Sequence, residues 1–130
     1  MNPTPKVFES EYRFCLLLWE MEPVKSAALV RRAEEALGWK PTTTYTVIKR
    51  LSERGILVNE QSVVRSLVSQ DDVQQAEIDE LVEKKFGGSL PAFVTAFTRR
   101  TKLKSDEIDE LQAMIDRMRK EADDECASGR

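Results

Sequence analysis

The chain has 130 residues, of which 41% are hydrophobic and 33% charged, enough for one small globular domain with an extension. It contains no histidine and two cysteines, which excludes a Ser-His or Cys-His nucleophile and a zinc site of the usual Cys/His kind. The longest apolar run, Phe14 to Trp19, has six residues, and no signal segment opens the chain. We therefore expect a cytoplasmic protein with reduced cysteines and no membrane, metal or cofactor partner.

The net charge of −3 is divided unevenly along the chain. Residues 1–70 carry ten Lys/Arg and eight Asp/Glu, a net charge of +2, whereas residues 71–130 carry ten and fifteen, a net charge of −5. This division favours two parts with different tasks, a first domain over residues 1–70 and a second over residues 71–130. A phosphate-binding first part fits the charge, although +2 alone is weak evidence for nucleic acid.

Hydrophobic periodicity and helix-end signals divide the chain into helices and one hairpin. Pro23 ends the first helix, Gly38 and Gly55 follow the second and third, and Ser105 caps the last. The expected elements in chain order are a loose tail over residues 1–6; helices over 9–21, 25–37 and 41 to about 54; strands over 56–60 and 63–68; helices over 71–85, 89–97 and from 105 onward; and a polar tail over 123–130.

Three helices followed by a two-stranded hairpin are the element order of a winged helix-turn-helix, in which the third helix enters the major groove of DNA. We therefore predict a mostly α-helical fold, a winged helix followed by a helical dimerisation region. The buried stripe of the third helix is Thr44, Val47, Ile48 and Leu51; its opposite arc holds Thr42, Thr46, Lys49 and Glu53, flanked by Thr43, Tyr45 and Arg50. Hydroxyls, a phenol and two cations suit phosphates and base edges, but a solvated helix face collects the same residue types.

Apolar residues after position 70 recur on single helix faces. On the last helix their spacing of three, four and three residues is close to a coiled-coil seam. Such a stripe could be core within one chain or a seam between two, and we favour a homodimer because an exposed stripe is costly. The candidate dimerisation residues are Ile78, Leu81, Val82, Phe93, Phe97, Ile108, Leu111, Ile115 and Met118.

A set of short motifs makes the comparison with known families specific. The motifs are the pairs Glu11-Tyr12, Leu18-Trp19 and Gly38-Trp39, the run from Pro41 to Leu51 (PTTTYTVIKRL), Glu53-Arg54-Gly55, Gly87-Gly88 and the stretch 103–111. Residues 7–60 resemble the N-terminal domain of the penicillinase repressor family, which includes methicillin-resistance and copper-responsive repressors. The later motifs resemble the family's C-terminal helices, so the resemblance covers about residues 7–118.

The resemblance implies a dimeric DNA-binding repressor without catalytic activity. By resemblance, Thr43, Tyr45 and Thr46 lie where the family reads bases, and Arg50 lies where it grips phosphate. The candidate DNA contacts are Thr42, Thr43, Tyr45, Thr46, Lys49 and Arg50 on the third helix and Arg65 on the wing. Each chain of the dimer is expected to bind half of a roughly palindromic operator in double-stranded DNA.

The chain departs from the family pattern at its sensing elements. The copper branch ends in a Cys-x-Cys cluster for soft metals, whereas only Cys126 lies near this C-terminus, so that chemistry has no ligands. The β-lactam branch is inactivated by cleavage before a phenylalanine; Phe97 matches that position, but Ala96 replaces the usual Asn. A regulatory protease is therefore a candidate partner, but we do not predict this cleavage. The operator, the regulated genes, the inducing signal and any redox role of Cys126 stay open.

Two other classes of function are alternatives to a repressor. Winged helices also serve as protein docking modules without specific DNA binding, and an acidic chain suits that alternative. An enzyme is disfavoured, because the chain lacks histidine, a reactive cysteine setting and a glycine-rich phosphate loop.

Overall fold

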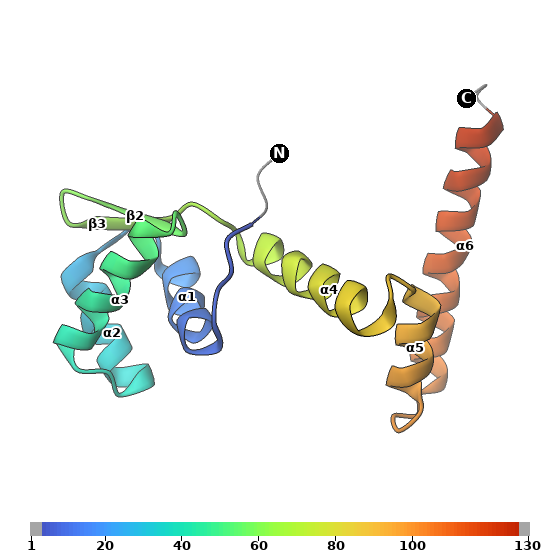
Figure 1. Cartoon of the computed structure of the whole chain (residues 1–130), viewed down its shortest axis with the longest axis horizontal. Helices are drawn as coiled ribbons and strands as arrows, with labels where there is room; N and C mark the ends of the chain where they lie inside the picture. The colour runs from blue at the N-terminus through green and yellow to red at the C-terminus, as the bar shows by residue number, and fades with distance from the viewer. Residues whose placement is uncertain (1–3, 128–130) are drawn as a thin grey trace. The chain divides into compact units, whose positions relative to one another are not determined.

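The structure is a computed structural model that describes residues 4–127 (Figure 1). Its elements are α1 (Glu9–Met21), β1 (Val24–Lys25), α2 (Ser26–Leu37), α3 (Pro41–Glu53), β2 (Leu57–Glu60), β3 (Val63–Ser66), α4 (Gln70–Phe86), α5 (Leu90–Thr98) and α6 (Ser105–Ala127). The chain forms two compact units, of which the first ends at Lys85 and the second begins at Phe86. The functional division predicted after residue 70 coincides with the start of α4 and stays a prediction.

Local chemistry explains where the helices of the first unit begin and end. Pro41 occupies the first turn of α3, where its missing N–H costs nothing. Gly38 follows α2 with φ +71°, a left-handed conformation that glycine adopts without a Cβ penalty. In the β2–β3 turn, Gln61 and Ser62 have φ values of +53° and +67°, so two consecutive left-handed residues reverse the chain as in a type I′ hairpin.

The hydrophobic core of the first unit lies between its three helices and its sheet. Phe14 and Leu18 from α1, Leu29 and Ala33 from α2, Ile48 and Leu51 from α3, and Ile56, Leu57 and Val64 from the hairpin are buried together. The ring of Trp39 stacks on Phe14 with centroids 5.6 Å apart. Figure 1 shows α1, α2 and α3 gathered against the hairpin. This arrangement confirms the predicted winged helix.

The wing differs from the expected two strands. Val24 and Lys25 form a short strand, β1, that pairs antiparallel with β3, so the sheet has three strands in the order β1-β3-β2. The predicted start of the second helix at Lys25 is therefore wrong by one residue. A two-residue strand has no hydrophobic period of its own, and only pairing with β3 makes it a strand.

Side chains in α1 and directly after it hold the end of β3 and the segment that joins it to α4. The indole N–H of Trp19 donates to the Val68 carbonyl at 2.9 Å. The Glu22 carboxylate accepts from both the backbone N–H and the hydroxyl of Ser66, at 2.6 and 2.9 Å. The connection from β3 to α4 is thus fixed to the first helix.

Both predicted tails need correction. Residues 1–3 and 128–130 lie outside the described residues, but Val7 is buried and the Lys6 carbonyl accepts a hydrogen bond from Arg54, so the chain before α1 is anchored. At the other end, α6 continues to Ala127 through the expected polar tail. Glutamate and alanine are good helix formers, and a helix without apolar residues at its end gives no periodic signal.

The second unit contains α5 and α6. The Ser89 hydroxyl caps α5 by accepting from the Ala92 N–H at 3.1 Å. Phe93 contacts the rings of Phe86 and Phe97, with centroids 5.5 and 6.3 Å apart. No described side chain of α5 or α6 is buried within one chain. None of the helices in the described part of the chain is long and apolar enough to span a lipid bilayer.

Candidate nucleic-acid interface

The third helix has one buried face and one exposed face, as its sequence predicts. Thr44, Val47, Ile48 and Leu51 are buried against the core. The six predicted DNA contacts on this helix, Thr42, Thr43, Tyr45, Thr46, Lys49 and Arg50, are all exposed. Because the buried stripe fixes the rotation of α3 about its axis, these six side chains are presented together on one side.

The exposed face of α3 has polar and charged groups that can still bind an external partner. The Thr46 hydroxyl donates to the Thr42 carbonyl at 2.9 Å, which leaves its oxygen lone pairs free to accept. Tyr45 is 47% exposed. Among the described residues, no carboxylate forms an ion pair with Lys49 or Arg50. These two cations are therefore available to an external anion.

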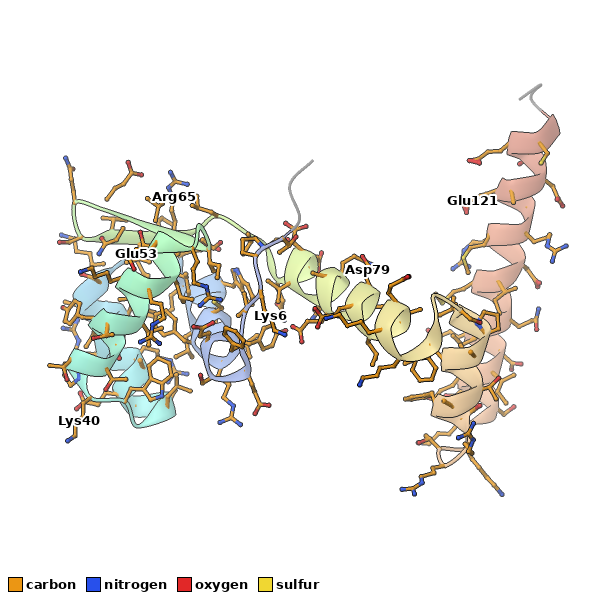
Figure 2. All side chains as sticks on the ribbon, in the orientation of Figure 1. Lys6, Lys40, Glu53, Arg65, Asp79 and Glu121 are labelled. Atoms are coloured by element: carbon orange, nitrogen blue, oxygen red, sulfur yellow. The ribbon has the colours of Figure 1, made fainter. Side chains whose placement is uncertain are left out.

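The predicted wing contact, Arg65, has an internal partner. Its guanidinium lies 3.2 Å from the Glu60 carboxylate across the hairpin, and both side chains are more than half exposed. An exposed ion pair of this kind contributes only about 0–1 kcal/mol, so a phosphate could displace Glu60 at small cost. Figure 2 shows Arg65 and Lys40, the residue before α3, pointing outward from the first unit.

Two exposed cations of the first unit, one in the sheet and one directly before α3, were missed by the sequence analysis. Lys25 is exposed in β1 opposite Val63, which adds a positive charge beside the hairpin. Its assignment to a helix hid this position. Lys40 is exposed immediately before α3. Lys40 could have been identified from the sequence, because it directly precedes the predicted first turn of the third helix.

The predicted dimerisation residues are mostly exposed in the single chain. Val82 and Phe93 are half-buried, whereas Ile78, Leu81, Phe97, Ile108, Leu111, Ile115 and Met118 are 42–56% exposed. Leu90, Val94 and Met114 are further exposed apolar residues that the stripe analysis omits. The nearly continuous apolar sequence of α5 could have identified Leu90 and Val94 as further candidates.

The two cysteines lie in opposite environments. Cys15 is buried in α1, and burial, aided by the nearby Glu11 carboxylate, raises the pKa of its thiol to about 12. Cys126 is exposed. The described residues contain no group of three or more His, Cys, Asp or Glu side chains suited to a metal ion. Cys15 is not placed for catalysis, because its buried thiol stays protonated at neutral pH.

The winged helix with its exposed polar third helix, and the later helices that expose apolar residues, together match one family along most of the chain. The model of the penicillinase repressor family matches residues 9–117. The chain belongs to this family. It is therefore a transcriptional repressor and not an enzyme, as the sequence motifs predict.

Curated relatives of this repressor match it over nearly their whole length. The methicillin resistance regulatory proteins MecI of Staphylococcus aureus (strain N315) and of Mammaliicoccus sciuri are each 22% identical over 120 residues, covering 89% of this chain and 98% of the relative. The penicillinase repressor of Bacillus licheniformis is 19% identical over 120 residues, covering 89% of this chain and 94% of the relative.

Proposed function

We propose that this repressor acts in the cytoplasm as a homodimer on a roughly palindromic DNA operator, with α3 of each chain in the major groove. Two recognition helices related by a two-fold axis bind two half-sites, and the bound dimer blocks the promoter. The wing contacts the DNA backbone beside each half-site through Arg65.

The exposed face of α3 is the observation that carries this proposal. Thr43, Tyr45 and Thr46 supply hydroxyls that hydrogen-bond base edges or phosphates. Among residues 4–127, Lys49 and Arg50 have no counter-ion, so binding phosphate displaces no ion pair seen there.

Exposure in the C-terminal half supports the homodimer. Among the residues whose burial is described, Val73 is the last buried one, and every later side chain is at least partly exposed. The apolar face of α6 would then be left in water in an isolated chain, at a cost that a second copy removes. We propose that Ile108, Leu111, Ile115 and Met118 lie in that interface, together with the apolar residues of α4 and α5 named above.

Selection from the source genome tests the proposal directly. The purified protein is incubated with fragmented genomic DNA at low salt, and the bound fragments are sequenced. We expect one roughly palindromic sequence to be enriched. A variant carrying Thr46→Ala and Arg50→Ala should lose the enrichment but stay dimeric in sedimentation, since both side chains are exposed. Arg13→Ala is the control, because Arg13 is an exposed arginine on α1 whose ion pair is with Glu9.

A protein docking module is the second candidate. The observation that favours it is the exposed apolar surface of α5 and α6 in an acidic half of the chain. Under this alternative, no DNA sequence is enriched at low salt, and the double variant of α3 keeps its biological function. Either result would refute specific operator binding.

A further inference from the structure

The guanidinium of Arg54 joins the end of α3 to two other parts of the first unit. Arg54 follows α3 directly, and its backbone N–H donates to the Arg50 carbonyl. Its Nη1 donates to Glu11 Oε2 of α1 at 2.7 Å, and its Nη2 donates to the Lys6 carbonyl before α1. One side chain thus bonds to two acceptors that are more than 40 residues away in sequence.

Glu11 completes this network from a buried position. It is 5% exposed, and its second oxygen, Oε1, accepts from the Phe8 N–H at 3.0 Å. The Phe8 ring lies under the guanidinium of Arg54, with 5.3 Å between the ring centroid and Cζ. The carboxylate is therefore paired, and removal of its cation would leave a buried negative charge with the Phe8 N–H but no counter-ion.

The same segment also contacts α4. Lys6 Nζ lies 3.6 Å from Glu80 Oε1, and Figure 2 shows Lys6 directed toward α4. Residues 4–7 and α4 line an open groove of about 640 Å³. The chain before α1 thus lies between the end of the proposed recognition helix and the helix that leads to the second unit.

We propose that Arg54 is a positioning residue for DNA reading, which fixes the C-terminal end of α3 through Glu11 and Lys6. Lys49 and Arg50 lie within the last turns of α3. Movement of the C-terminal end of this helix would therefore displace both side chains from the DNA groups that they contact. A direct phosphate contact is a poorer role for Arg54, because two of its nitrogens already donate within the protein and its side chain is only 29% exposed. This inference rests on the proposed function.

Arg54→Lys separates positioning from charge. A lysine keeps a positive charge beside Glu11 but lacks the planar fork that bonds two acceptors at once. Affinities of the full-length protein for the selected operator and for a scrambled duplex are measured over a range of salt concentrations, at a temperature where circular dichroism shows both proteins folded. Arg13→Lys is the matched control, as this exposed arginine bonds to Glu9 within α1.

We expect operator affinity to fall about tenfold for each chain, the factor that loss of one charge-assisted hydrogen bond represents, and so about 100-fold for the proposed dimer, while affinity for the scrambled duplex and the salt slope stay unchanged. The affinity of non-specific binding depends on phosphate contacts, whereas specific binding also requires side chains to be aligned with the base edges that they contact. A parallel loss on both duplexes with a smaller salt slope would identify a phosphate contact and overturn the inference. Unchanged affinity for both duplexes would overturn it as well. If the wild-type protein selects no operator, the proposed function itself has failed.

Discussion

Replacement of Ile115 by alanine tests whether the α6 stripe joins two chains. Ile115 is 52% exposed in one chain. Complete burial of an isoleucine side chain stabilises by about 1.5–3 kcal/mol, so burial of the remaining half contributes about half of that per copy. A two-fold dimer contains the residue twice. After allowance for the contact that alanine retains, the loss is about 1–2 kcal/mol, which raises the dimer Kd roughly 5- to 30-fold.

Sedimentation equilibrium of the full chain without DNA measures this Kd. Alanine has the highest helix propensity, so circular dichroism should show α6 unchanged and exclude unfolding as the cause. Lys120→Ala is the control, because Lys120 is exposed on the opposite face of α6 at 100° per residue. Equal dimer Kd values for Ile115→Ala and the wild type, or an equal loss in the control, would refute the seam.

Three further predictions concern Arg50, the two cysteines and the hydrogen bond between Trp19 and Val68. Arg50→Ala removes one proposed phosphate contact per chain, so in a dimer the slope of log Kobs against log salt should decrease in magnitude by about 1.8 in fluorescence anisotropy titrations; an unchanged slope would contradict the phosphate role. A thiol reagent at pH 8 should label Cys126 and leave the buried Cys15 unlabelled; rapid labelling of both thiols would refute the burial of Cys15. The folded state keeps the Cys15 proton that the unfolded state releases near pH 9, so the free energy of unfolding should fall as the pH rises from about 9 to 12. Trp19→Phe leaves the Val68 carbonyl without its indole donor and should lower the free energy of urea unfolding by about 1–3 kcal/mol; no loss would show that the bond is dispensable.

The winged helix was predictable because its signals are local. Thr44, Val47 and Ile48 recur at helical spacing, and Pro41 and Gly55 bracket the helix that contains them. The hydrophobic period therefore separated the buried face of α3 from its exposed face. Which exposed residues contact DNA is a different question, since solvent and phosphate favour the same residue types.

The features that sequence analysis missed depend on residues far apart in the chain. Val24 and Lys25 become a strand through pairing with β3, and a two-residue segment has no period to detect. The chain near Lys6 has the composition of a tail, but Arg54 anchors it from 48 residues away. Arg65 has a counter-ion in Glu60 that the hairpin register brings across the turn.

The contrast in burial between the two halves of the chain has a consequence for gene duplication. Core residues such as Phe14 and Leu51 must fit neighbours encoded by the same gene copy. In the proposed dimer, each apolar residue of α6 must fit a second chain, and every substitution there occurs twice. After a duplication, two copies could stop forming mixed dimers through a few changes between Ile108 and Met118, while both keep the same reading helix. Partner choice and operator choice can thus diverge separately.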